Sequence, residues 1–190
     1  MKRHNQRCKE CKVRIEELLF QIYGEVKPNY NLKIPAKPED YIGSSLGTDL
    51  EKIHTELQEH RGYKNFVRVK NYIAPVDFYV PEPGLIVEFD ESQHFTALRK
   101  LALSLYPNNL KLGFDRERWK DLCEKEDKHD ISPLYRDEQR AWYDTLRDFS
   151  PILLDINPTI RLYARDYIWC SLDSKKTLDQ EEFKHLLGMN

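Results

Sequence analysis

The sequence predicts an α/β (α+β) fold in which a small mixed β-sheet is flanked by helices. Apolar residues recur at helical spacing in several segments, the first of which spans 12–23. Two β-rich segments, 76–80 and 85–90, flank the residues Pro-Glu-Pro-Gly, whose composition favours a tight turn between paired strands. Further helical segments and a last β-rich segment follow, and this order places helices against a sheet within one core.

The chain divides into four parts by composition and pattern. A basic helix with a candidate zinc knuckle occupies 1–24, and a stretch punctuated by proline and glycine at 25–47 predicts an extended linker or arm rather than core structure. The main core is expected over 48–172, and a C-terminal helix over 173–190.

Each element of the core has a local signal. Thr48 and Glu51 form a capping-box pattern that opens a helix, and Gly62 ends it. Ser132 and Pro133 have the composition of a helix start. The remaining segments follow from apolar spacing: strands at 66–69, 76–80, 85–90 and 160–172, and helices at 97–105, 115–128, 132–149 and 177–187.

Composition limits the class of protein. With 40% hydrophobic and 33% charged residues over 190 positions, the chain resembles globular proteins rather than disordered ones. No apolar run approaches the roughly 20 residues of a membrane-spanning helix, and the N-terminus lacks the apolar stretch of a secretory signal, so a cytoplasmic protein is expected. The net charge of −2 does not exclude DNA as a partner, because basic residues can cluster on one face. Such a cluster lies near the N-terminus, and its candidate DNA-binding residues are Arg3, Arg7, Lys9 and Lys12.

Three carboxylates lie on the predicted hairpin. Glu88 and Asp90 are two residues apart on one strand, so their side chains point to the same face. A turn at 81–84 places Asp77 of the preceding strand across from Glu88. Like charges this close repel strongly unless a cation lies between them. Oxygen ligands with open solvent positions suit Mg²⁺, or Mn²⁺, acting on substrate phosphates.

A purely structural interpretation of these acids stays open, because acids on strands usually face solvent. The segment 85–90 is otherwise strongly apolar, however, and acids are depleted from buried strands. This composition favours the functional interpretation.

The pattern Asp77 … Glu88-x-Asp90-x-x-Gln93-His94 resembles the PD-(D/E)XK nuclease superfamily. In particular it is similar to the branch that contains the very-short-patch mismatch repair endonuclease. The resemblance spans residues 48–172 and implies a restriction-endonuclease-like core that hydrolyses phosphodiester bonds of DNA with a divalent metal.

The resemblance also implies roles for single residues. Asp77 and Glu88 would be metal ligands, whereas Asp90 stands where the superfamily's motif has lysine, so the helper of the attacking water is missing. Asp90 is kept as a third candidate ligand of Mg²⁺. Gln93 or His94 could position water or phosphate instead, and the alternative for His94 is a histidine of the core or the surface.

A helical part of the resemblance lies at Asp137-x-x-Arg140. Arg140 could clamp a phosphate with two hydrogen bonds, or it could pair with Asp137 as a solvated couple on one helix. The superfamily also tends to carry a glutamate on the helix before the first core strand. Glu56 is favoured for this position over Glu59, which lies close to the helix end.

A second metal signal is His4-x-x-x-Cys8-x-x-Cys11. The four cysteines of a chain in a reducing compartment argue against a disulfide scaffold. Cys8 and Cys11 could supply two zinc ligands, but a closed structural site needs four. The candidate completions are His4, Cys123, His129 and Cys170. The alternative is two partly exposed cysteines in a basic tail.

Three functions compete at this point. The leading one is a Mg²⁺-dependent DNA endonuclease of the repair or restriction type. The alternatives are a catalytically inactive relative that binds nucleic acid and a zinc-stabilised interaction module. DNA is the expected partner, and a homodimer is a candidate assembly that would decide between nicking and double-strand cleavage.

Overall fold

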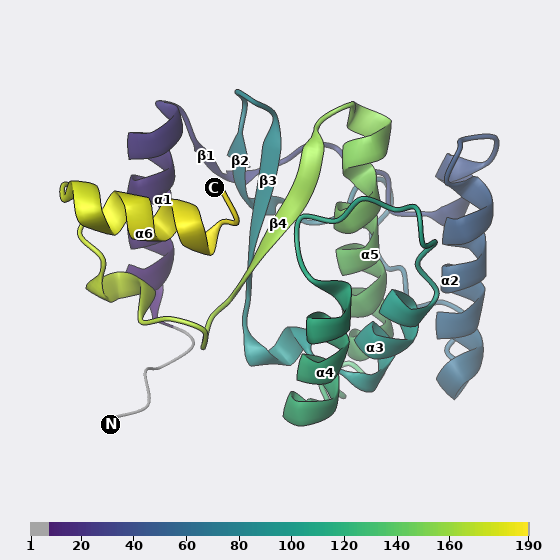
Figure 1. Ribbon diagram of the computed structural model, residues 1–190. Coiled ribbons are helices and arrows are strands. Elements are labelled where there is room, and N and C mark those ends of the chain that lie inside the picture. Colours follow the sequence, from purple (N-terminus) through teal and green to yellow (C-terminus); the bar gives the residue numbers. More distant parts are fainter. Residues whose placement is uncertain (1–7, 190) are drawn as a thin grey trace.

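The computed structural model describes residues 8–189 and consists of three layers, with a central sheet between two groups of helices (Figure 1). The helices are α1 (Lys9–Tyr23), α2 (Gly47–Arg61), α3 (Ala97–Ser104), α4 (Arg116–Glu126), α5 (Arg136–Leu154) and α6 (Thr177–Leu186), with short 3₁₀ turns η1 (Pro38–Tyr41), η2 (Ser92–His94) and η3 (Trp169–Ser171). The strands are β1 (Lys27–Tyr30), β2 (Val76–Val80), β3 (Leu85–Asp90) and β4 (Asn157–Tyr163). The predicted mixed α/β class is confirmed.

The sheet has the order β1-β2-β3-β4 in the described part of the chain. β1, β2 and β3 pair antiparallel, and β4 pairs parallel to β3 after the crossover through α3, α4 and α5. Gly84 closes the hairpin between β2 and β3 with φ of 76°, a conformation that favours glycine. All six residues of β3 are buried, as expected of a central strand covered on both faces.

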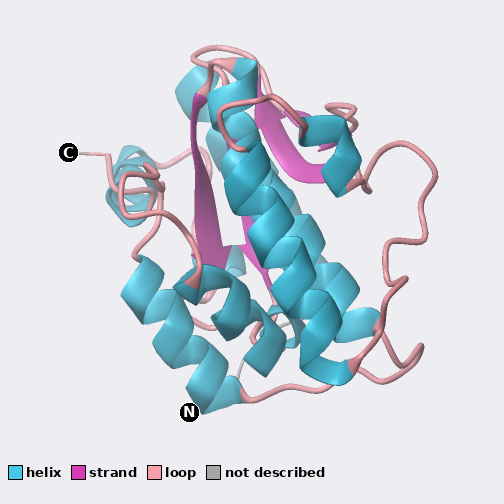
Figure 2. Cartoon of the chain, turned by 90° about the vertical axis from the view of Figure 1, so that its right-hand side faces the viewer, coloured by secondary structure: helices cyan, strands magenta, loops and turns pink. Residues whose placement is uncertain are grey.

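Each face of the sheet has its own apolar core. On one face, α1, η3 and α6 pack on the strands, and the core includes Leu19, Phe89, Trp169 and Phe183. On the other face, α2 to α5 enclose a larger core around Trp142. Figure 2, seen from the α2 side, shows this second group of helices in front of the strands. The basic N-terminal helix is therefore one layer of the core and not a separate attachment.

The prediction of a linker or arm at 25–47 is wrong in part. β1 adds an edge strand to the sheet by pairing with β2. Ile34, Ala36 and Tyr41 are buried in the larger core, where Trp142 donates a hydrogen bond to the Ala36 carbonyl at 2.8 Å. Proline breaks regular structure in this stretch without keeping its apolar side chains out of the core.

Two predicted strands also differ from the structure. Residues 66–69 are irregular, and the Phe66 carbonyl accepts a hydrogen bond from the Gln139 side chain rather than from a neighbouring strand. The strand expected at 160–172 ends at Tyr163, because β3, its partner, ends at Asp90 and the last backbone bond between them joins Ala164 to Asp90.

The helix starts are less regular than their sequence signals. α5 begins at Arg136, several residues after Ser132, and neither α2 nor α6 has a side chain that caps its first turn. No helix in the described residues combines the length and the apolar character that crossing a bilayer requires.

Candidate functional site

The hairpin brings Asp77 and Glu88 together, as the strand pattern predicts. Phe78 pairs with Val87 in the antiparallel register, which puts Asp77 beside Glu88. The Asp77 amide donates to Glu88 Oε1 at 3.1 Å, and the Phe89 amide donates to Asp77 Oδ2 at 2.9 Å. Where the β2–β3 ladder ends, each carboxylate thus accepts a hydrogen bond from a backbone N–H of the other strand. These two hydrogen bonds hold the carboxylates in place.

Asp90 does not join these two acids, so the expected convergence of three carboxylates is wrong. Its Oδ1 lies 2.8 Å from Arg161 Nη1, and its Oδ2 accepts from the Trp119 indole at 2.9 Å. Asp90 is buried, and its oxygens are taken up by side chains of β4 and α4. Among residues 8–189 the hairpin acids form no group of three close ligand atoms.

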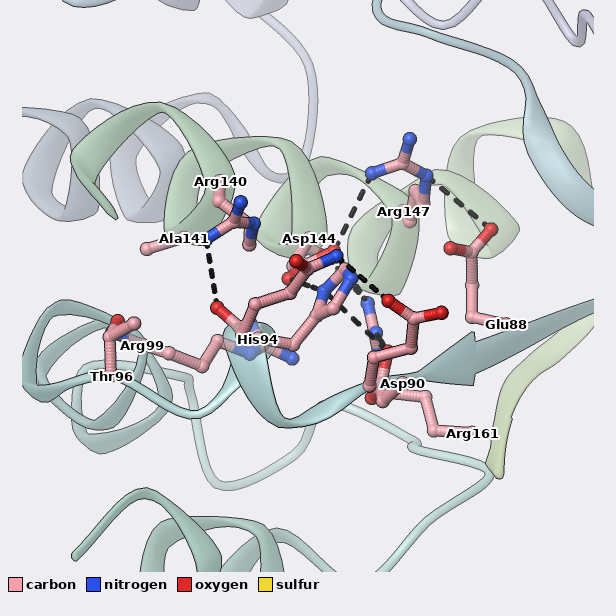
Figure 3. Close-up of polar contacts among 12 residues, drawn as sticks. Glu88, Asp90, His94, Thr96, Arg99, Arg140, Ala141, Asp144, Arg147 and Arg161 are labelled. Atoms are coloured by element: carbon pink, nitrogen blue, oxygen red, sulfur yellow. Dashed lines mark hydrogen bonds and ion pairs between the residues drawn. The ribbon is translucent and has the colours of Figure 1, made fainter. Parts of the chain in front are cut away.

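Asp77 and Glu88 each have a cationic partner within the protein. Lys12 Nζ on α1 lies 2.6 Å from Asp77 Oδ1, and Arg147 Nε on α5 lies 3.4 Å from Glu88 Oε1. Figure 3 shows Arg147 between Glu88 and Asp144. Sequence reasoning assigned Lys12 to DNA binding and passed over Arg147, because both residues reach the hairpin only through tertiary packing.

Burial sets the electrostatics of Glu88. It raises the pKa of this carboxyl to about 7, and the nearby Arg147 guanidinium offsets only part of the increase. Asp77 adds to the rise because it is a second negative charge close by. A buried carboxyl with a pKa this far above its ordinary value, next to another carboxylate, is typical of functional sites.

A buried ionic network extends from Asp90 along α5 (Figure 3). Arg161 Nε lies 2.7 Å from Asp148 Oδ1, and Arg99 Nη2 lies 2.6 Å from Asp148 Oδ2. Arg161 also donates to the backbone carbonyl of Asp144 at 3.1 Å. The charged side chains of Asp144 and Asp148 on α5 are thus directed into the core.

His94 belongs to the same network. Its Nδ1 lies 2.8 Å from Asp144 Oδ2 and 3.7 Å from Asp90 Oδ1. Burial alone would lower the pKa of His94, but the Asp144 and Asp90 carboxylates outweigh burial and raise this pKa above its ordinary value. His94 is therefore held by protein groups, and Gln93 beside it binds Glu91 through its side chain at 3.1 Å.

Arg140 is also used inside the protein. It donates to the Gln93 carbonyl at 2.8 Å and to Asp130 Oδ2 at 3.0 Å, and lies 4.0 Å from Asp137 Oδ1. Asp137 is fully buried, so the alternative of a solvated couple between these two residues is wrong. Through its hydrogen bond to the Gln93 carbonyl, Arg140 holds η2 against α5.

Several other predicted site residues lie apart from the hairpin acids. Glu56 is exposed on α2, which packs against η1, α3 and α5, and Lys9 is exposed on α1. Arg3, Arg7 and His4 lie outside the described residues.

Three of the cysteines form a second cluster. The sulfur atoms of Cys8, Cys11 and Cys170 all lie within 4.8 Å of one another, and this group could hold a metal ion. Cys123 is buried in the core on the other face of the sheet, and His129 is exposed beside Asp127. Of the completions that sequence reasoning left open for Cys8 and Cys11, the fold brings Cys170 to them.

The chain matches no known family model, and no curated protein and no solved structure is significantly similar to it.

Proposed function

We propose that this protein is a metal-dependent DNA endonuclease in which Asp77 and Glu88 hold a Mg²⁺ or Mn²⁺ ion. The observation that carries the proposal is the pair of adjoining carboxylates at the end of the β2–β3 ladder, anchored by the Asp77 and Phe89 amides. Carboxylate oxygens are the ligands that these hard cations prefer. When bound, the ion supplies an activated water and stabilises charge on the scissile phosphate.

A metal ion at this position would have to displace cationic side chains that now neutralise the two acids. Lys12 and Arg147 already place positive groups against Asp77 and Glu88. Asp77 retains 21% of its side-chain exposure and Lys12 retains 41%, whereas Glu88 is almost completely buried. Substrate would thus approach from the side of Asp77 and Lys12, and Glu88 would bind the metal ion from the buried side.

Lys12 offers an answer to the missing lysine of the motif. The resemblance expects an ammonium group at position 90, where this chain has Asp90 in a structural ion pair with Arg161. Lys12 brings an ammonium group to Asp77 from α1 instead. In this proposal Lys12 orients the attacking water or a phosphate oxygen, while Asp90 takes no part in metal binding.

The substrate class follows from charge. Of the basic residues of α1, Lys12 contacts Asp77 and Lys9 is exposed on the same helix, and Arg3 and Arg7 precede this helix in the sequence. Basic side chains next to a metal site attract the phosphate backbone independently of its sequence. A cytoplasmic location, where DNA is accessible and thiols stay reduced, completes the proposal.

Plasmid nicking tests this function. Supercoiled plasmid is incubated with the protein and Mg²⁺, Mn²⁺ or EDTA. The variants Asp77→Asn and Glu88→Gln are compared with the control Glu82→Gln, which removes one negative charge at an exposed position of the same hairpin. Losing several kcal/mol of transition-state stabilisation lowers the nicking rate by about a hundredfold or more. We expect this loss in Asp77→Asn and Glu88→Gln only. Folded protein that never nicks, or undiminished nicking by Asp77→Asn, would overturn the proposal.

One observation favours an inactive nucleic-acid-binding relative as the second candidate. Lys12 and Arg147 neutralise the two acids without any metal. This candidate predicts salt-dependent binding of a labelled duplex, measured by fluorescence anisotropy, with no cleavage and no change on adding Mg²⁺.

A further inference from the structure

We propose that Cys8, Cys11 and Cys170 bind a zinc ion that fastens the beginning of α1 to η3. Their three sulfur atoms lie within 4.8 Å of one another, although Cys170 is far from the other two in the sequence. Sulfur atoms bound to one tetrahedral zinc at about 2.3 Å stand about 3.8 Å apart. Movements of about an ångström or less would therefore close the three sulfurs around the ion.

Each of these cysteines lies in a helical element or directly before one. Cys8 is the residue that precedes α1, and its carbonyl accepts the Cys11 amide at 3.1 Å, so both side chains leave the first helical turn on one side. Cys170 is the central residue of η3, which packs against α1. Its neighbour Trp169 is buried and donates to the Tyr163 carbonyl at 3.2 Å, which anchors η3 to the end of β4.

The chemistry of the cluster favours zinc over harder cations. Thiolates are soft ligands that bind zinc well and bind Mg²⁺ poorly. Burial raises the pKa of the Cys11 thiol to about 12, so zinc would displace the thiol proton as it binds the sulfur. Three thiolates leave one position of the tetrahedron, which solvent or a further ligand would fill.

The position of the cluster links it to the hairpin acids. Cys8 immediately precedes α1 and stands four residues, about one helical turn, before Lys12. Zinc that ties Cys8 and Cys11 to η3 would limit sliding of α1 over the sheet. This consequence rests on the proposed endonuclease function, whereas the zinc site itself does not.

Metal analysis tests the proposal directly. The full chain is purified under reducing conditions without chelator, and its zinc content is measured by mass spectrometry. We expect about one zinc per chain in the wild type and in Cys123→Ser, whose cysteine lies outside the cluster, and a loss of most zinc in Cys8→Ser and Cys170→Ser. Zinc retained at the wild-type level by Cys170→Ser would overturn the assignment.

Cobalt substitution gives a second measurement on the unaltered protein. Co²⁺ in a tetrahedral thiolate site produces sulfur-to-cobalt charge-transfer absorption, whose intensity grows with the number of thiolates. Reduced wild-type protein that contains no zinc and gives no such band contradicts the proposal. So does a disulfide between cluster cysteines, detected by alkylation before reduction. Neither result depends on nicking, so the endonuclease proposal can fail separately.

Discussion

Lys12 and Asp77 are 65 residues apart in the sequence, yet the Lys12 ammonium lies 2.6 Å from the Asp77 carboxylate. The same ammonium is 5.8 Å from the centre of the Phe89 ring on β3. These contacts make α1 a part of the candidate site, although its sequence suggested only a basic attachment. Because the Lys12 ammonium competes with any metal ion for Asp77, a change at Lys12 should alter metal binding as well as the nicking rate.

Replacing Lys12 with methionine should lower the nicking rate and tighten metal binding at the same time. Loss of a group that orients water or phosphate lowers the single-turnover rate by about a hundredfold. Removal of a competing cation from Asp77 should reduce the Mg²⁺ concentration needed for half-maximal rate. Single-turnover nicking over a Mg²⁺ titration measures both quantities.

The matched control for Lys12 is Lys9→Met, at an exposed position of the same helix. It should weaken DNA binding slightly and leave the rate on bound DNA unchanged. If Lys12→Met behaves like Lys9→Met, Lys12 belongs to the DNA-binding surface alone.

Replacing Asp90 with asparagine should affect stability more than metal dependence. The change removes a carboxylate from fully buried Arg161, and breaking a buried ion pair costs about 3 to 5 kcal/mol. Asp77→Asn breaks a more exposed pair with Lys12 and should cost about 1 kcal/mol or less. Urea unfolding followed by tryptophan fluorescence compares the two. An Asp90→Asn variant that is as stable as wild type, but has lost its Mg²⁺ response, would restore Asp90 as a metal ligand.

His94 should stabilise the fold more strongly at low pH than at high pH. Its pKa is raised in the folded protein, so its contribution is complete below about 6.5, the unfolded value, and is lost as the pH rises through the folded value. A hydrogen bond between charged groups contributes roughly 1.5 to 3 kcal/mol.

The measurement is the unfolding free energy of wild type and His94→Gln at pH 5.5 and pH 8.5. The variant should lose roughly 1.5 to 3 kcal/mol at the lower pH and clearly less at the higher one. An equal loss at both values would mean that His94 packs as a neutral side chain. His129→Gln, at an exposed position, provides the control.

Removing zinc should loosen the start of α1. A structural zinc stabilises the state that binds it, so a strong chelator should lower the melting temperature by about 5 °C or more. Hydrogen exchange should accelerate at residues 8–12 and around η3, and remain unchanged in α5. Cys170→Ser should melt early with or without chelator. A wild-type melting curve that the chelator leaves in place would contradict a structural ion.

The elements that sequence predicts well are those whose pattern is local. The hairpin of β2 and β3 follows from two apolar strands and a four-residue turn, and α1 and α3 follow from regular apolar spacing. The stretch 66–69 has the same alternation as a strand, but it lacks a strand partner and bonds to Gln139 instead. Alternation indicates which side chains are buried, and pairing requires a second segment that only packing supplies.

Asp77 and Glu88 are predictable as neighbours from local pattern, because strand periodicity and a short turn set the register of one hairpin. The Cys-x-x-Cys spacing likewise indicated that Cys8 and Cys11 could serve together as ligands of one metal ion. The partners of these groups, in contrast, are not predictable from local pattern. Lys12, Arg147 and Arg161 come from three different elements, and Cys170 comes from a fourth. Local spacing dictates the face on which a side chain lies, whereas the partner on that face depends on how separate elements pack together.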